Sequence, residues 1–246
     1  MDKITQIYGI RAVMEAVSAN EEIDKVFIQK GLKGDLIKEL EGLLRRNEIT
    51  VSYVPPEKLN RLTKNNHQGV VANISPIAFF SLESLVEKVL VNEKPALFLL
   101  LDQLSDVRNF GAIIRTAECS GVDGIIIQKK GAAPVTADTI KTSAGAAFKV
   151  PLAKVDHLKD AVFYLQASGV QIVSATEKTN TSVYDIEFNK STAIVMGSED
   201  RGITPSILKA SDQCAKIPLL GEIGSLNVSV ACAVLLYEVV RQRLKV

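Results

Sequence analysis

The hydrophobic positions of the first 75 residues change several times between a helical and a strand period. Four leucines between residues 36 and 44 recur on one helix face, which predicts a helix over 35–46 with Asp35 as its N-cap. The same patterns predict helices at 8–17 and 55–62, and strands at 25–29, 49–54 and 70–74. We therefore expect a small α/β domain at residues 1–75.

The second part of the chain carries strands that are apolar at every position. Residues 96–101 read ALFLLL and residues 124–127 read GIII, which is typical of strands buried on both faces of a sheet. Further strands are predicted at 170–174, 193–196 and 215–219, and helices at 110–120, 139–147, 157–168 and 227–243, with another helix starting at Thr204-Pro205. This alternation predicts an α/β domain over 96–246, with a mostly parallel sheet and helices on both faces.

Between these two parts, residues 76–95 show a weaker pattern and include one possible helix at 81–91. We expect this segment to be the linker between the two domains. No internal repeat or low-complexity tract interrupts the chain.

The composition restricts the possible classes of protein. The net charge is +1 and 23% of the residues are charged, so bulk charge does not indicate a nucleic-acid partner. The longest apolar run of interest, 228–236, is too short to span a bilayer, and the first residues lack the apolar core of a signal peptide. We therefore expect a cytoplasmic protein with no membrane partner.

Cysteine and histidine are few and widely spaced. The three cysteines show no pairing or metal-ligand spacing, and the two histidines, His67 and His157, are far apart. Reduced thiols, buried or half-buried in a cytosolic protein, explain the cysteines best. A histidine-based metal site and a Ser-His-Asp triad are poorly supported, and we expect no metal.

The candidate chemistry begins after the strand at 96–101. The segment 102–111 contains one glycine and no GxGxxG pattern, and the chain has no GxxxxGK[ST] pattern, which argues against dinucleotide and P-loop sites. Asn109 lies at the predicted helix start, where its side chain could cap free N–H groups. Arg115 lies off the centre of that helix's apolar stripe. By itself it is better explained as a surface cation than as a ligand-binding guanidinium at the carboxyl edge of the sheet.

Two later segments combine glycine with polar residues. A buried strand ends at Gly197, and a tight turn follows that contains Glu199 and Gly202. Farther along, a glycine-containing loop leads to Ser225 and Asn227 at the start of the last helix. An ordinary turn and a well-capped helix explain these features equally well, although glycine would also let the backbone approach a ligand closely.

Taken in order, the three segments resemble the SpoU family of RNA ribose methyltransferases, part of the knotted (SPOUT) class. The matching sequences are NFGAIIRTAE at 109–118, IVMGSEDRGI at 194–203 and IPLLGEIGSLNVSVA at 217–231. Residues 8–13 and 67–72 also look like the substrate-binding domain of large-subunit rRNA guanosine 2′-O-methyltransferases, which is similar to the ribosomal-protein L30e fold.

The resemblance implies a fold, an activity and partners. It implies a trefoil knot in the C-terminal domain, an L30e-like RNA-binding domain before it, and a homodimer with residues 227–243 in the interface. The implied reaction is methyl transfer from S-adenosylmethionine, without a metal, to a ribose 2′-hydroxyl, expected to be that of a guanosine in large-subunit (23S) rRNA.

The resemblance also implies roles for individual residues. Arg115 is expected to act on the 2′-hydroxyl. The residues expected to orient it, the ribose and the cofactor are Asn109, Glu199, Ser225 and Asn227. Those expected to contact S-adenosylmethionine are Gly197, Ile217 and Leu226, and those expected to contact RNA are Arg61, Lys64, His67 and Gln68. One departure is Asp200, where many relatives have glycine, and we expect its carboxylate to face solvent or Arg201.

Four alternatives stay open at this point. The chain could be a tRNA ribose methyltransferase, although such enzymes usually lack a domain like residues 1–75. It could be a resistance methyltransferase that modifies an antibiotic site on rRNA. A non-catalytic rRNA-binding assembly factor would have no reason to keep all five candidate catalytic residues. A small-molecule α/β enzyme would leave the extra domain unexplained.

Overall fold

The computed structural model describes residues 6–244, and the chain divides into two compact units, Met1–Ala78 and Phe79–Val246. The ends of the two predicted domains, residues 1–5 and 245–246, lie outside the described residues. Each unit has its own sheet, and each is described by itself below.

The first unit contains a four-stranded sheet in the order β1-β4-β2-β3. β2 runs parallel to β3, and β4 pairs antiparallel with both β1 and β2. The strands are β1 Gln6–Tyr8, β2 Ile23–Gln29, β3 Val51–Val54 and β4 Val70–Ile74, and the helices are α1 Ile10–Ser18, α2 Asp35–Arg46 and α3 Pro56–Leu62.

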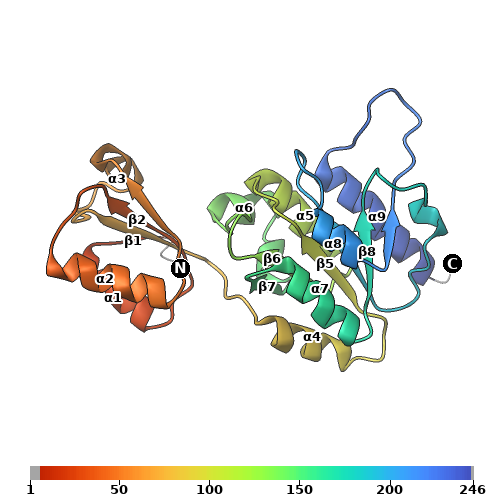
Figure 1. The fold of residues 1–246 in the computed structure, drawn as a ribbon, viewed down its shortest axis with the longest axis horizontal. Helices are drawn as coiled ribbons and strands as arrows, with labels where there is room; N and C mark the ends of the chain where they lie inside the picture. Colours follow the sequence, from red (N-terminus) through yellow and green to blue (C-terminus); the bar gives the residue numbers. More distant parts are fainter. Residues whose placement is uncertain (1–5, 245–246) are drawn as a thin grey trace. The chain divides into compact units, whose positions relative to one another are not determined.

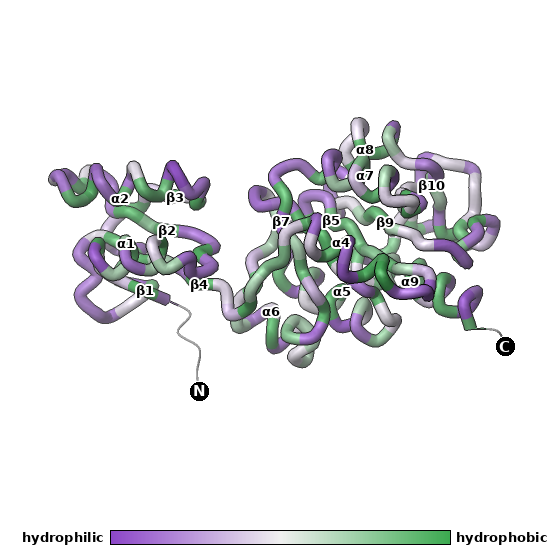
Figure 2. The backbone as a smooth tube through the Cα atoms, turned by 90° about the horizontal axis from the view of Figure 1, so that it is seen from below, coloured by the Kyte–Doolittle hydropathy of each residue, from purple (hydrophilic) through white to green (hydrophobic). Residues whose placement is uncertain are grey.

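The main core of this unit lies between the sheet and the helices α1 and α2. Val26, Val70 and Ala72 of the sheet pack with the apolar faces of both helices, and α2 alternates between hydrophilic and hydrophobic residues in Figure 2. Two predicted details were wrong. Tyr8 ends β1 instead of starting a helix, and Asp35 is the first residue of α2, whose N-cap position is Gly34.

The second unit contains a six-stranded, fully parallel sheet in the order β10-β8-β9-β5-β6-β7 (Figure 1). The strands are β5 Leu97–Leu101, β6 Gly124–Gln128, β7 Leu152–Val155, β8 Gln171–Ala175, β9 Thr192–Met196 and β10 Gln213–Ala215. The helices are α4 Leu82–Leu90, α5 Val107–Cys119, α6 Ala137–Thr142, α7 Leu158–Ala167, α8 Pro205–Ala210 and α9 Val228–Arg243. The fold class predicted from the apolar strands is therefore confirmed for this unit.

Helices cover both faces of the parallel sheet. The apolar sides of α4, α7 and α8 form one core with alternate residues of β5, β6, β8 and β9. α5 and α9 pack against each other, and α9 also contacts β9. Within residues 76–95, the segment that we expected to be a linker, Leu85 and Val86 of α4 belong to this core.

The sequence patterns missed β7 and misplaced β10. β7 follows a proline and is only four residues long, so its period-two signal is short. β10 covers Gln213–Ala215, whereas we predicted a strand over 215–219. Pro218 cannot donate a ladder hydrogen bond, so the apolar residues around it form a loop instead. The predicted helix 139–147 is the shorter α6 followed by a turn of 3₁₀ helix at Ala146–Phe148.

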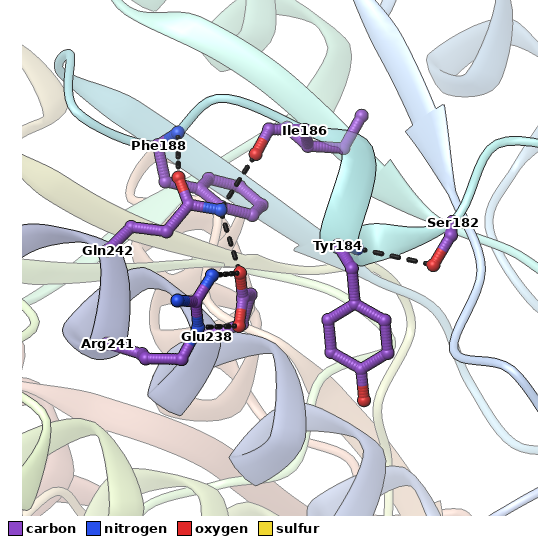
Figure 3. Close-up of polar contacts among 7 residues, drawn as sticks. All are labelled: Ser182, Tyr184, Ile186, Phe188, Glu238, Arg241 and Gln242. Atoms are coloured by element: carbon purple, nitrogen blue, oxygen red, sulfur yellow. Dashed lines mark hydrogen bonds and ion pairs between the residues drawn. The ribbon is translucent and has the colours of Figure 1, made fainter.

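Polar contacts fix α9 to the segment that precedes β9 (Figure 3). The Gln242 side chain donates to the Ile186 carbonyl at 2.9 Å and accepts from the Phe188 backbone N–H at 2.9 Å. The buried Glu238 carboxylate accepts from Arg241 at 2.8 Å and from Gln242 at 2.7 Å. The hydrogen bond from Arg241, assisted by that from Gln242, lowers the pKa of Glu238 against the opposing effect of burial.

Arg243, at the end of α9, makes a second attachment. Its half-buried guanidinium donates to four backbone carbonyls, those of Pro95, Ala96, Phe188 and Lys190. Burial lowers the pKa of Arg243, partly offset by the negative charge of Asp123. These contacts hold the C-terminal end of α9 against the start of the sheet.

Candidate functional site

The carboxyl ends of the parallel strands bring the three candidate segments to one edge of the sheet. The segment 102–106 follows β5, the turn 197–204 follows β9, and residues 176–182 follow β8. The loop 216–227 follows β10 and leads into α9. Ligands in open parallel sheets bind at this edge, because the loops there leave a crevice between neighbouring strands.

A cleft lies between these loops at the ends of β8, β9 and β10. Ile217, Ser225 and Leu226, three of the predicted site residues, line it. Gly197 is not part of the lining, but the preceding Met196 is. The remaining lining residues are Ala175, Thr176, Glu177, Ala215, Lys216, Leu219, Gly224, Ala231 and Leu235. Apolar walls with a few polar groups suit a nucleoside-sized ligand such as S-adenosylmethionine.

Gly197 is required by close backbone packing. A Cβ atom at this position would lie 2.1 Å from the Gly202 carbonyl carbon and 2.3 Å from the Ile203 nitrogen. Ser198 and Gly202 pair in a short antiparallel bridge, and the Gly202 N–H donates to the Ser198 carbonyl at 2.9 Å. The turn is therefore folded tightly onto the end of β9, with Glu199 at its tip.

Asn109, Glu199 and Asn227 form one hydrogen-bonded network, although Asn109 is 90 residues from Glu199 and 118 from Asn227 in the sequence. Glu199 Oε1 accepts from Asn109 Nδ2 at 3.0 Å and from Asn227 Nδ2 at 2.8 Å. Asn227 Nδ2 also donates to Asn109 Oδ1 at 3.1 Å. The network joins α5, the turn after β9 and the start of α9. We refer to these three residues as the Asn-Glu-Asn network.

The capping prediction was wrong for Asn109 and is confirmed for Asn227. Asp106 is the N-cap of α5 and accepts from the Asn109 N–H at 2.7 Å, so the Asn109 side chain is free to reach Glu199. Asn227 Oδ1 caps α9 by accepting from the Ser229 N–H at 3.0 Å. Capping turns the amide Nδ2 of Asn227 towards the Glu199 carboxylate, which an aspartate at this position would repel.

Arg115 and Ser225 are not joined to the Asn-Glu-Asn network by any hydrogen bond among the described residues. Arg115 is exposed on α5 and has no acidic partner in the described part of the chain. The surface ion pair that would explain it as an ordinary surface cation is therefore missing between residues 6 and 244. Asp200 is exposed, as expected.

Asp102 is a residue of this edge that the sequence analysis did not single out. Its side chain is fully buried, and Oδ2 accepts from the Thr204 N–H at 2.7 Å. This bond ties the end of β5 to the end of the turn that carries Glu199. An acidic residue directly after a run of apolar strand residues was the available signal, because such a carboxylate must find a donor when the strand is buried.

The RNA-binding candidates lie together in the first unit, but they differ in exposure and in whether their side chains already have hydrogen-bond partners. Arg61 on α3 and Lys64 after it are exposed. The His67 ring is engaged at both nitrogens, since Nδ1 accepts from the Gly69 N–H at 2.9 Å and Nε2 lies 3.0 Å from Asn60 Oδ1. His67 therefore shapes its turn, and Gln68, at a positive φ of 49°, is left at the exposed tip.

The described residues contain no cluster of three histidine, cysteine, aspartate or glutamate side chains that could hold a metal ion. Cys119 is exposed, contrary to the expectation that all three thiols are at least half-buried. Cys232 is buried, and burial raises the pKa of its thiol to about 12.

Between residues 6 and 244, none of the helices has the length and apolar character needed to cross a membrane.

Comparisons with known proteins place both units. Residues 96–237 match the sequence model of the SpoU rRNA methylase family, and residues 6–80 match that of the RNA 2′-O ribose methyltransferase substrate-binding domain. A relative from Staphylococcus aureus (strain MSSA476), named as a TrmH-family tRNA/rRNA methyltransferase, is 37% identical over 240 residues, which cover 97% of this chain and 96% of the relative.

Solved structures agree with the sequence relatives. The SpoU methyltransferase AviRb from Streptomyces viridochromogenes, in complex with AdoMet, has a TM-score of 0.61 at 25% identity, covering 98% of this chain and 90% of that one. The A. aeolicus TrmH/SpoU tRNA modifying enzyme has a TM-score of 0.55 at 29% identity, covering 66% of this chain and 84% of that one. The chain therefore belongs to the SpoU (TrmH) family of RNA methyltransferases, enzymes that use S-adenosylmethionine.

Proposed function

We propose that this enzyme methylates the ribose 2′-hydroxyl of a nucleotide, a guanosine, in large-subunit (23S) rRNA. The Asn-Glu-Asn network supports this proposal most directly, because three segments far apart in the chain place polar side chains beside the cleft. The network lies where the loop that lines the cleft meets α9, so a ribose held there would face a cofactor held in the cleft.

The cleft residues fit S-adenosylmethionine. Ile217 and Leu226 supply apolar surface, Ser225 supplies a hydroxyl, and the tight turn at Gly197 brings backbone close to the cleft. When bound, the cofactor supplies a methyl group on a sulfonium that is already a good leaving group. The protein then has two remaining tasks, which are to position the ribose and to deal with the proton of its hydroxyl.

We assign to Arg115 the role of acting on the ribose 2′-hydroxyl. A guanidinium stays protonated at neutral pH and is a poor base, so another group takes the proton of the hydroxyl as the methyl group is transferred. The exposure of Arg115 without an acidic partner leaves its N–H groups available to bind a phosphate of the target nucleotide and stabilise developing negative charge on the 2′-oxygen. The Asn-Glu-Asn network and Ser225 orient the ribose and the cofactor around this group.

The substrate assignment is tested by methyl incorporation from labelled S-adenosylmethionine. Three unmodified RNAs are compared: a transcript of the peptidyl-transferase region of large-subunit rRNA, a tRNA pool and small-subunit rRNA. We expect label in the first RNA only, at the 2′-oxygen of a guanosine. We expect the Arg115→Ala enzyme to lose at least about 100-fold of the rate, because losing one donor to a developing oxyanion costs that much.

The other outcomes separate the parts of the proposal. Label in tRNA would keep the chemistry and overturn the substrate. tRNA is the second candidate, because the Staphylococcus relatives are named for both RNAs and the A. aeolicus structure is a tRNA modifying enzyme. Cofactor binding without label in any RNA would overturn free rRNA as substrate and lead to a test on assembling ribosomal particles. A chain that does not bind the cofactor would be a non-catalytic RNA-binding factor.

The first unit is assigned to substrate binding as an L30e-like domain, with Arg61, Lys64, His67 and Gln68 as the part nearest RNA. Support comes from the match of residues 6–80 to a substrate-binding domain. It also comes from the closeness of the two N-terminal motifs. The Gly9 N–H donates to the Val70 carbonyl at 3.0 Å, and the Gln68 side chain lies beside Gly9. An enzyme that acts on rRNA in this way would work in the cytoplasm.

The knot is a further part of the proposal. After β10 the chain runs beside residues 181–183, with hydrogen bonds from Val183 N–H to the Lys216 carbonyl and from Lys216 N–H to the Thr181 carbonyl. α9 then attaches to the 186–190 part of the same loop. These contacts support a trefoil knot, in which the C-terminal segment would pass through the loop between β8 and β9.

We also infer that the enzyme is a homodimer through α9. Val228, Leu235 and Val239 of α9 are buried within the unit and belong to its own interior. Val230 and Tyr237 are seven residues apart on the other side of α9 and are about half exposed. Light scattering at micromolar concentration is expected to give twice the 26.7 kDa chain mass, and a monomeric mass would exclude the dimer.

A further inference from the structure

The sheet of the first unit has one face that helices cover and one that they cover only in part. Facing residues in neighbouring strands share a face, so the register assigns each side chain. Val26 and Ala72 face α1 and α2. On the other face, α3 covers a small cluster of Phe27, Val54, Leu59 and Val71. The rest of that second face is not part of any apolar cluster between residues 6 and 244.

The uncovered part of the second face carries an aromatic ring and amides. Tyr8 pairs with Val71, Gln6 with Asn73, and Asn73 with Lys25, so their side chains all point to this side. Tyr8 is 40% exposed, and Gln6 Nε2 donates to Asn73 Oδ1 at 3.3 Å. We refer to Gln6, Tyr8, Lys25 and Asn73, together with Lys58 of α3, as the open face.

Two lysines of the open face converge on one aromatic ring. Lys25 Nζ lies 5.5 Å and Lys58 Nζ lies 5.6 Å from the centre of the Phe27 ring. Neither ammonium has a carboxylate partner among the described residues. A ring attracts a cation but does not neutralise it. The fold thus places two positive charges without carboxylate partners near one ring, where an anion could bind to them.

We infer that the open face binds a single-stranded segment of the substrate RNA, with phosphates at Lys25 and Lys58 and a base stacked on Tyr8. Unpaired bases have free faces, and proteins bind them with exposed aromatic rings beside cations. The amides of Gln6 and Asn73 can read the edge of a base. The inference rests on the proposed function, and it adds which surface of the first unit takes the RNA.

The open face adjoins the patch of Arg61, Lys64 and Gln68. Tyr8 directly precedes Gly9, and the Gln68 side chain lies beside Gly9. α3 carries both Lys58 and Arg61. One strand of RNA could therefore follow the sheet face and continue past the turn at Gln68 without leaving the unit.

The test measures binding of the peptidyl-transferase-region transcript to the full chain by filter binding at several salt concentrations. The double variant Lys25→Glu/Lys58→Glu is expected to bind at least about tenfold more weakly. The slope of the logarithm of the binding constant against the logarithm of the salt concentration is expected to be smaller in magnitude by about 1.4, because each contact with a single-strand phosphate contributes about 0.7 to that slope. The matched control is Arg45→Glu/Arg46→Glu at the end of α2. This variant changes the net charge by the same amount, but on the side of the sheet that α1 and α2 cover. Its RNA affinity is expected to stay within about twofold of that of the wild type.

Stacking is tested with a second matched pair. Tyr8→Ala is expected to weaken RNA binding about tenfold, as loss of a stacked base does. Tyr53→Ala is the control, because Tyr53 is also exposed but faces α2, where its hydroxyl donates to Glu41 at 2.6 Å. Lys25→Gln/Lys58→Gln serves as a milder variant should charge reversal disturb folding, and S-adenosylmethionine affinity should stay unchanged in every variant.

The outcomes distinguish this inference from the proposed function. Wild-type RNA affinity in the Lys25/Lys58 and Tyr8 variants, with a loss in Arg61→Glu/Lys64→Glu, would overturn the open face and leave the methyltransferase proposal intact. Equal losses in the open-face variants and in the α2 control would also overturn it, because only long-range charge would then matter. A wild-type enzyme that methylates no RNA would instead count against the proposed function.

Discussion

Replacing Gly197 with alanine is expected to abolish S-adenosylmethionine binding and to reduce methyl transfer at least about 100-fold. The added Cβ would lie 2.1 Å from the Gly202 carbonyl carbon and 2.4 Å from the Gly202 oxygen. These are backbone atoms, so no side-chain rotation relieves the overlap, and the turn must move away from β9. A displacement of about 1 Å at a reacting centre is enough to cost about 100-fold in rate. Isothermal titration with the cofactor and methyl incorporation measure the two effects.

Gly221→Ala is the matched control. It adds the same methyl group to the loop that borders the cleft, but a Cβ there meets nothing within 4 Å and the backbone needs no positive φ. We expect wild-type cofactor affinity and activity in this variant. The thermal unfolding midpoint of Gly197→Ala should also fall, since overpacking costs about 1–3 kcal/mol. Wild-type cofactor binding in Gly197→Ala would show that the turn tolerates opening and would contradict its assigned role.

The second large effect is expected at Glu199. Glu199→Ala removes the acceptor shared by Asn109 and Asn227, so both amides lose a fixed orientation. We expect kcat to fall by about 100-fold or more, as it does when one preorganised polar group of an active site is removed. Cofactor affinity should change little, because Glu199 does not line the cleft. Single-turnover methylation and cofactor titration separate the two quantities.

Asp200→Ala provides the control for Glu199. Asp200 is its exposed neighbour on the same turn, and we expect activity within about twofold of the wild type. The double variant Glu199→Ala/Asn109→Ala should be little worse than Glu199→Ala alone, because residues that act as one unit have non-additive effects. Fully additive losses would show that the two side chains act independently. A parallel loss of cofactor affinity would show that the Asn-Glu-Asn network acts on the cofactor and not on the ribose.

Much of the fold follows from residue patterns. Runs such as 96–101, apolar at every position, are typical of strands buried on both faces, and this property favours a parallel sheet between layers of helices. The elements missed or misplaced are those with the shortest patterns. β7 and β10 are held by pairing to neighbours already in the sheet, so their own sequences carry little information.

The residues of the candidate site could be predicted from the sequence, but their hydrogen-bond partners could not. Order along the chain selected Asn109, Glu199 and Asn227, yet the sequence assigned Asn109 to a cap that Asp106 provides. Local patterns describe what a side chain can do within a few residues of its backbone. Which of several possible partners it takes depends on atoms that only folding brings near.

By itself the sequence determined the class of the fold and the membership in a family, and it supplied the candidate residues for the chemistry, because apolar periods and motif order are local or linear properties. Only the tertiary structure decided that the amides of Asn109 and Asn227 share Glu199 Oε1, that Gly197 is required by backbone only 2.1 Å from its missing Cβ, and that Lys25 and Lys58 both lie near the Phe27 ring. Each of these depends on a distance between segments that the chain separates, and such a distance is set by the packing of the whole unit.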